Sequence, residues 1–258
     1  MKRMDNPPIL QRLVNLDLKV SEDQYERHIL ECAERIKTTF NAEIVWRPFM
    51  RLYAKPETLS VERGKTVQLL NFAVESASER YRVRIPEIKP EGFALSVVQS
   101  RLGDVVTTYS NLREFLGLLF DCLDPLVGRV GLFDFHYHNC FSPARQPEFW
   151  EDGVPKWKEI APFFNPTGLP YAHGFIPDLS VDYDPMDGDE GWKHLRLFNG
   201  GEGPQSHPHL CFCFKRNRPH VLDRARFMEK LDLAHNEIIE MYERYFTPEL
   251  TESPEHGP

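Results

Sequence analysis

Histidine and cysteine residues recur at alternate positions in two separate stretches of the chain. The first stretch contains His136, His138 and Cys140, and the second contains His207, His209, Cys211 and Cys213. Alternate positions of a β-strand face the same side of a sheet. Neutral imidazole and thiolate are the usual ligands of zinc. If the two stretches are neighbouring strands, their faces could bind zinc, with Asp134 orienting an imidazole for a metal-dependent hydrolase or nuclease.

A purely structural interpretation of the same residues is also open. A buried cysteine behaves as a small hydrophobic residue, and a partly buried histidine forms hydrogen bonds with nearby polar groups. Two histidines separated by one residue are common, and nothing in the sequence shows that the two stretches are neighbours. We therefore predict no resident cofactor, with zinc at His136, His138, His207 and His209 as the alternative.

A stretch rich in proline and aromatic residues follows the first of these strands, over residues 142–170. It contains Trp150, Trp157 and the pair Phe163 and Phe164. Disordered segments have few large aromatic residues, so this stretch is expected to be ordered. Aromatic side chains also dominate the binding energy of protein interfaces. We predict that these four residues anchor a protein partner or a second copy of the chain.

Basic residues gather near the C-terminal end of the chain. The candidate phosphate-binding patch consists of Lys215, Arg216, Arg218 and Arg224. The whole chain has 31 basic and 39 acidic residues and a net charge of −8, which disfavours broad contact with a phosphate backbone. We expect weak, salt-sensitive binding of nucleic acid at most.

Other common catalytic and ligand-binding motifs do not occur in the sequence. The acidic residues around Gly188 have the wrong spacing for a calcium loop, and the glycines at 200–203 precede a proline and a strand instead of a helix. The sequence has no GxSxG motif. We therefore favour a non-enzymatic protein over an enzyme.

The elements that position these residues follow from hydrophobic periodicity. Residues 129–141 form the clearest strand, and apolar residues spaced three and four apart predict helices over 21–40, 111–126 and 222–246. Pro48 restricts the apolar run 42–53 to an edge or bulged strand. These elements predict an α+β fold with an antiparallel or mixed sheet and about three principal helices. We expect a single domain over 1–258, with two similar halves divided near 100–110 as the alternative and a frayed tail at 251–258.

The composition also indicates the cellular compartment in which the protein is expected. Hydrophobic residues make up 41% of the chain, enough for a sizeable core, but no apolar run is long enough to span a membrane. The five cysteines lie inside expected helices and strands, unlike a disulfide framework of a secreted protein. We predict a cytoplasmic protein without a membrane segment.

Two stretches resemble a known family. One is the closing segment, which runs from Leu231 through His235 and Ile238 to Leu250, and the other is the start of a strand, from Arg129 to Leu132. Both resemble a sporadically distributed family of uncharacterised bacterial and archaeal proteins of similar length. The family pattern differs just after Leu132. The resemblance brings no catalytic residue, but a sporadic distribution implies a host-defence context. The favoured function is therefore a recognition or adaptor subunit in bacterial host defence.

Overall fold

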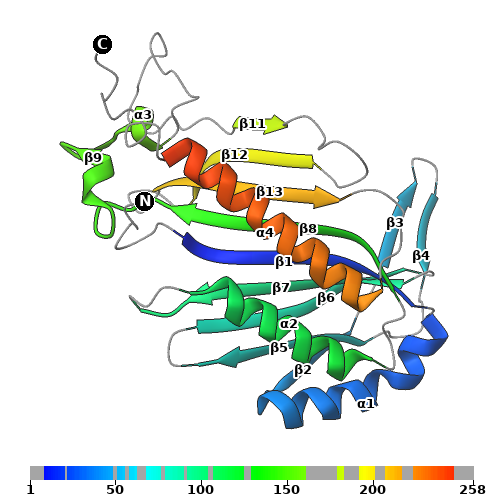
Figure 1. The fold of residues 1–258 in the computed structure, drawn as a ribbon. Coiled ribbons are helices and arrows are strands. Elements are labelled where there is room, and N and C mark those ends of the chain that lie inside the picture. Colours follow the sequence, from blue (N-terminus) through cyan, green and yellow to red (C-terminus); the bar gives the residue numbers. More distant parts are fainter. Residues whose placement is uncertain are drawn as a thin grey trace. The chain divides into compact units, whose positions relative to one another are not determined.

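The computed structural model describes most of the 258 residues (Figure 1). The described ranges are 9–20, 22–48, 51–55, 58–62, 68–76, 79–89, 92–103, 107–124, 129–160, 179–182, 192–200, 207–216 and 223–246.

The chain separates into two compact units that each use distant parts of the sequence. Unit 1 comprises Met1–Arg12, Asp134–Arg216 and Lys230–Pro258, and unit 2 comprises Leu13–Phe133 and Asn217–Glu229. The limits of the units fall inside two strands and one helix, and none falls at residues 100–110.

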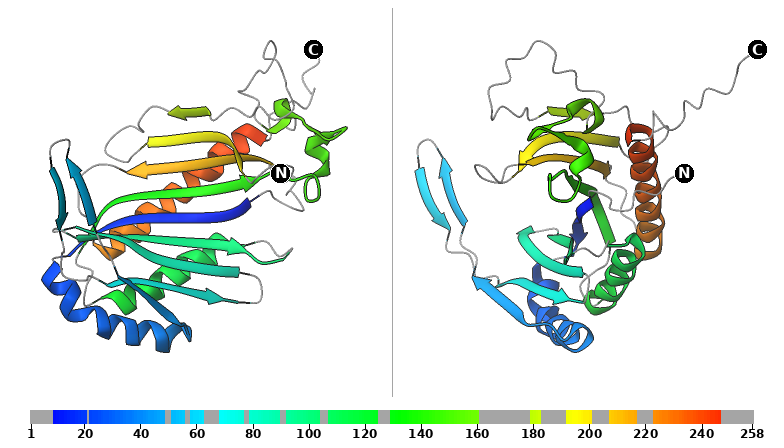
Figure 2. Two further views of the ribbon diagram at one scale, coloured as in Figure 1. Left: turned by 180° about the vertical axis from the view of Figure 1, so that it is seen from behind. Right: turned by 90° about the vertical axis from the view of Figure 1, so that its left-hand side faces the viewer.

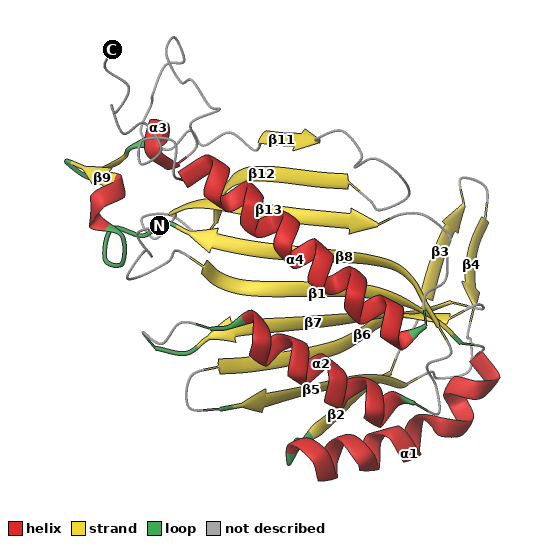
Figure 3. Cartoon of the chain, in the orientation of Figure 1, coloured by secondary structure: helices red, strands yellow, loops and turns green. Residues whose placement is uncertain are grey.

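Unit 2 combines a β-sheet with helices (Figure 3). The strands are in the order β1-β7-β6-β5-β2, and β5, β6 and β7 form an antiparallel meander. Its elements are β1 (Ile9–Lys19, in this unit from Leu13), α1 (Glu22–Phe40), β2 (Ile44–Pro48), β3 (Arg51–Lys55), β4 (Thr58–Glu62), β5 (Gln68–Glu75), β6 (Glu79–Lys89), β7 (Gly92–Arg101) and α2 (Tyr109–Leu123). The unit also contains the starts of the strand Arg129–Cys140, to Phe133, and of the helix Arg224–Phe246, to Glu229. Strand β2 is last in the order, as Pro48 predicted.

Helix α2 covers one face of this sheet because its apolar residues meet buried strand residues. The ring of Phe115 stacks on Tyr81 of β6 at 4.1 Å between centroids and lies 4.9 Å from Phe40 of α1. The buried carboxylate of Glu79 accepts a hydrogen bond from the backbone N–H of Thr108, the N-cap residue of α2. One buried side chain thus connects a strand to the start of the helix.

Unit 1 consists of a sheet with one long helix. The strands are in the order β11-β12-β13-β8, and β11, β12 and β13 pair antiparallel. Its elements are β8 (Arg129–Cys140, in this unit from Asp134), a 3-10 turn (Pro147–Phe149), β9 (Trp150–Glu151), β10 (Val154–Pro155), α3 (Trp157–Ile160), β11 (Leu179–Asp182), β12 (Trp192–Gly200), β13 (His207–Arg216) and α4 (Arg224–Phe246, in this unit from Lys230).

Helix α4 packs on only one face of the unit 1 sheet (Figure 2). Phe212 of β13 lies 5.8 Å from Tyr242 of α4, and the hydroxyl of Tyr137 on β8 is 2.6 Å from Nδ1 of His235. The residues of β8 that point to α4 are buried, and those at alternate positions are only half-buried. The two-residue period of the sequence therefore places Asp134, His136 and His138 on the face opposite the helix.

The observed elements confirm the predicted α+β fold. The three long helices coincide with the predicted segments within two residues at their starts, and the large sheet is formed by antiparallel strand pairs wherever the register is defined. No helix in the described part of the chain is both long and apolar enough to cross a membrane.

Candidate functional site

Strands β8 and β13 are neighbours in unit 1, so the two histidine and cysteine stretches lie side by side. Nε2 of His138 is 2.7 Å from Nδ1 of His209, and Sγ of Cys211 is 3.6 Å from Nδ1 of His136. The later residue of β8, His138, contacts the earlier residue of β13, His209, which indicates that the two strands are antiparallel. The structure thus brings together, with Cys213, five of the residues that the sequence singled out.

The imidazole of His138 also contacts a side chain that the sequence reasoning missed. Nε2 of Gln11, on β1, is 2.8 Å from Nδ1 of His138. When the Gln11 amide donates to Nδ1, Nε2 of His138 carries the proton and donates to Nδ1 of His209. The signal for Gln11 was present in the sequence, because the alternating pattern of β1 leaves this position on the less buried face.

The imidazole of His136 lies between two thiols. Nε2 is 3.4 Å from Sγ of Cys213, while Nδ1 contacts Cys211. Asp134 lies further away, with its Oδ2 4.0 Å from Nε2, beyond hydrogen-bond distance. The two ring nitrogens therefore contact different sulfur atoms.

Burial keeps this group of side chains uncharged near neutral pH. It lowers the pKa of His136 from 6.5 to about 4, and the charges of Lys215, His194 and His138 act in the same direction. Burial also lowers the pKa of His138 to about 4, with His209 adding to the effect. The imidazoles are therefore neutral hydrogen-bonding groups at pH 7.

The thiols of Cys211 and Cys140 are also uncharged near neutral pH. Burial raises the pKa of Cys211 to about 12, although Arg196 and Lys215 oppose the shift. Burial likewise raises the pKa of Cys140. Because thiolate is the nucleophilic form of cysteine, neither residue is activated for nucleophilic catalysis.

A row of planar side chains extends from the histidines toward solvent. The ring of Phe198, on β12, is stacked on His209 and lies 5.3 Å from both His209 and His138. The guanidinium of Arg196 lies over Phe198 at 5.1 Å and is exposed. We call Arg196, Phe198, His209 and His138 the planar row. Sequence reasoning missed Arg196 and Phe198, although their alternation with the buried Leu195 and Leu197 marks them as residues of the opposite face.

The other predicted metal ligand, His207, lies apart from these contacts. Its ring is 6.0 Å from that of Trp150, in an edge-on arrangement. Among the described residues, no group of three or more His, Cys, Asp or Glu side chains is arranged to hold a metal ion. The histidine faces are thus adjacent, but the structure contains no assembled set of metal ligands in its described part.

The four predicted partner anchors fall in different surroundings. Trp157 is only 6% exposed, so its side chain packs inside unit 1, and Trp150 is half-buried against His207. Phe163 and Phe164 lie outside the described residues. The aromatic stretch therefore contributes to packing at Trp157.

The predicted phosphate patch is divided between the two units. Lys215 is half-buried in unit 1, whereas Arg224 lies in unit 2, where it pairs with Asp121 and donates to the carbonyl of Gly117 at 2.9 Å. The side chain of Arg216 and the whole of Arg218 lie outside the described residues. Arg224 is therefore already neutralised by a carboxylate.

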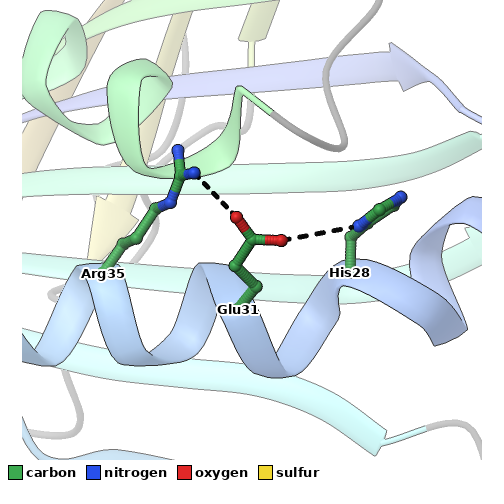
Figure 4. Close-up of polar contacts among 3 residues, drawn as sticks. All are labelled: His28, Glu31 and Arg35. Carbon is green, nitrogen blue, oxygen red and sulfur yellow. Dashed lines mark hydrogen bonds and ion pairs between the residues drawn. The ribbon is translucent and has the colours of Figure 1, made fainter.

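A groove of about 670 Å³ between α1 and α2 is a second candidate site, in unit 2. Its charged residues are paired with neighbours on the surface: Glu31 contacts both Arg35 and His28, as Figure 4 shows, and Asp121 pairs with Arg224. The groove is lined by Glu31, Glu34, Arg35, Thr38, Thr39, Leu118, Asp121 and Cys122. These pairs leave no clear charge to attract a ligand.

Comparison of the chain with protein families, with curated proteins and with solved structures gives no match. The resemblance based on the strand start at Arg129 and the closing helix stays a prediction.

Proposed function

We propose that the protein is a non-enzymatic recognition or adaptor protein that binds a protein partner on the face of the unit 1 sheet opposite α4. The observation that supports this proposal best is the planar row. Arginine and aromatic residues are the types that contribute most to binding energy at protein interfaces. The row ends in the exposed Arg196, and its other end consists of the hydrogen-bonded imidazoles of His209 and His138.

The charge state of the site also favours recognition over catalysis. Neutral His138 and protonated Cys211 can form hydrogen bonds and apolar contacts without the cost of removing a charge from water. Covering these two side chains therefore costs a partner little desolvation free energy. A contact surface needs this property, whereas an activated nucleophile or general base would need a pKa shifted toward its task.

The cellular context of this proposal comes from the sequence. We propose a cytoplasmic location, which is supported by five cysteines that form no disulfide. We also propose that the partner belongs to a bacterial host-defence system, an expectation that rests on the family resemblance alone.

Co-purification with matched variants tests the proposal. The tagged full chain, a variant with Arg196→Ala and Phe198→Ala, and the control Glu240→Ala would be purified from native cells. Glu240 is exposed on α4, away from the proposed face. A stoichiometric protein partner should be retained by the control and lost from the double variant. Circular dichroism would confirm that each variant is folded, and Arg196→Glu provides a second variant that keeps Phe198.

Two results would contradict the proposal. One is a partner that the double variant and Arg196→Glu retain as well as the wild type does. The other is a homogeneous protein that has no partner but turns over a substrate.

A metal-dependent hydrolase or nuclease is the second candidate function. The adjacency of His136, His138 and His209 favours it, because neutral imidazoles can bind zinc without first losing a proton. Against it, two zinc-bound nitrogens at about 2.0–2.1 Å from the metal would lie roughly 3.4 Å apart, whereas the His138 and His209 nitrogens are 2.7 Å apart. Elemental analysis of the purified chain decides: a stoichiometric metal that His138→Ala and His209→Ala remove would support this second function.

A further inference from the structure

Strand β6 of unit 2 carries two exposed arginines on the face of the sheet opposite α2. Arg82 and Arg84 are exposed and alternate with the buried Tyr81, Val83 and Ile85, which point toward the helix side. Figure 2 (left) shows this region from behind, with β6 and β7 in front of α2. The two guanidinium groups therefore project from the open side of the unit 2 sheet.

Several other arginines of unit 2 have partners among the described residues. Arg80 pairs with Glu75, Arg35 with Glu31, and Arg101 donates to the carbonyl of Gly103 at 3.1 Å. The structure gives the side chains of Arg82 and Arg84 no hydrogen bond or ion pair with any described residue. Two like charges without a carboxylate repel each other, so an anionic ligand would relieve this repulsion.

The neighbouring strands leave the two guanidinium groups accessible. Arg82 lies opposite Val98 of β7 and Ala73 of β5, and Arg84 lies opposite Ser96 and Asn71. These neighbours are short and uncharged, so they neither neutralise nor cover the long arginine side chains. Arg82 and Arg84, with these four neighbours, are called the arginine strip.

The strip has the chemistry and spacing to contact phosphate groups. Guanidinium forms two parallel hydrogen bonds with a phosphate. Residues two apart on a strand are about 6.6–6.8 Å apart, so the two guanidinium groups can each contact a separate phosphate of one flexible nucleic acid strand. The strip has no aromatic ring for base stacking, so its contacts would be with the backbone only.

We infer that the arginine strip binds the phosphate backbone of single-stranded nucleic acid without sequence preference. The net charge of −8 does not prevent this, because charges beyond a Debye length of about 8 Å are screened at physiological salt. This inference does not depend on the recognition function proposed for unit 1, since the two surfaces share no residue. It also differs from the basic patch predicted from the sequence, because Arg224 of that patch is paired.

Fluorescence anisotropy with labelled oligo-dT of twenty nucleotides tests the inference. The full chain would be compared with a variant carrying Arg82→Ala and Arg84→Ala. The control variant carries Arg35→Ala and Arg226→Ala. It also loses two positive charges, but from exposed helical positions of unit 2. Wild-type affinity should fall with salt with a log-log slope of about −1.4, as expected for two phosphate contacts. The strip variant should bind about tenfold more weakly with a flatter slope, and the control should bind like wild type.

Further arms separate the alternatives. A variant with Arg82→Lys and Arg84→Lys should keep most of the salt dependence, because it keeps both charges.

Absence of binding at low salt, equal weakening in the control, or equal affinity for duplex of the same length would overturn the inference. If polyglutamate displaces the labelled oligonucleotide at a lower concentration of negative charge than unlabelled oligo-dT does, that result would also overturn the inference. It would identify an acidic protein segment as the occupant. The Arg196→Ala, Phe198→Ala variant should bind oligo-dT normally, so failure of one proposal does not affect the other.

Discussion

At the scale of single residues, the histidines on the open face of unit 1 make stability depend on pH. The pKa values of His136 and His138 are about 4 in the folded chain and about 6.5 in an unfolded chain. Between these values the unfolded state binds more protons than the folded state. The free energy of unfolding should therefore be highest above about pH 6.5 and should decrease as the pH falls toward about 4. For His136, which is only 18% exposed, the shift corresponds to about 3 kcal/mol at most.

Urea denaturation between pH 7.5 and 4 measures this dependence. A variant with His136→Gln and His138→Gln should lose part of the slope, because glutamine does not titrate. His28, which is on the surface of α1, provides the matched control His28→Gln. A slope that is as steep in the double variant as in the control would show that these two imidazoles do not cause the pH dependence.

At the scale of elements, the carboxylate of Glu79 connects β6 to the start of α2. It is 2% exposed and accepts hydrogen bonds from the hydroxyl of Tyr81 at 2.5 Å, the Gln99 amide at 3.1 Å and the backbone N–H of Thr108 at 3.0 Å. Glu79→Ala would leave these donors buried without this acceptor. We expect the free energy of unfolding to fall by about 3 kcal/mol in urea denaturation, against less than about 1 kcal/mol for the exposed Glu75→Ala. Equal effects of the two changes would contradict this role.

The close approach of β1 and β7 is a second element-scale feature. A Cβ atom on Gly92 would lie 1.9 Å from the carbonyl oxygen of Leu18, so the two strands would have to move apart. We expect Gly92→Ala to lower the free energy of unfolding by about 3 kcal/mol or more. Gly103 has φ +62° but open space around it, so Gly103→Ala should cost only about 1 to 2 kcal/mol. Chemical denaturation of both variants measures the difference, and a smaller loss at Gly92 would be inconsistent with the contact.

At the scale of the whole molecule, neither unit is a continuous segment of chain. Unit 2 needs residues 217–229, where Phe227 packs 5.3 Å from Phe120 and 5.5 Å from Phe133. A fragment of residues 13–133 lacks this ring and should not fold cooperatively. Circular dichroism during urea denaturation of the fragment and of the full chain checks this. A cooperative transition of the fragment with the midpoint of the full chain would show that unit 2 folds without Phe227.

The sequence by itself determined the elements and their faces. The alternation of apolar and polar residues predicted that Phe135 and Tyr137 are packed while His136 and His138 lie on the other side of β8, and this is confirmed. The three long helices and the end position of β2 also followed from local patterns. These features are predictable because helix and strand periods depend on residues close in the chain.

Only the tertiary structure decided which of these faces meet. The histidines on β8 and β13 are about 70 residues apart, and the sequence could not show that His138 contacts His209 while His207 faces Trp150. Gln11 and Phe198 come to the same place from two further strands. Strand order and register depend on the packing of the complete core. The entropic cost of closing a loop changes only slowly with its length, so loop length does not decide which strands become neighbours. Many pairings of the same strands are therefore compatible with the local pattern, and long-range packing selects one of them.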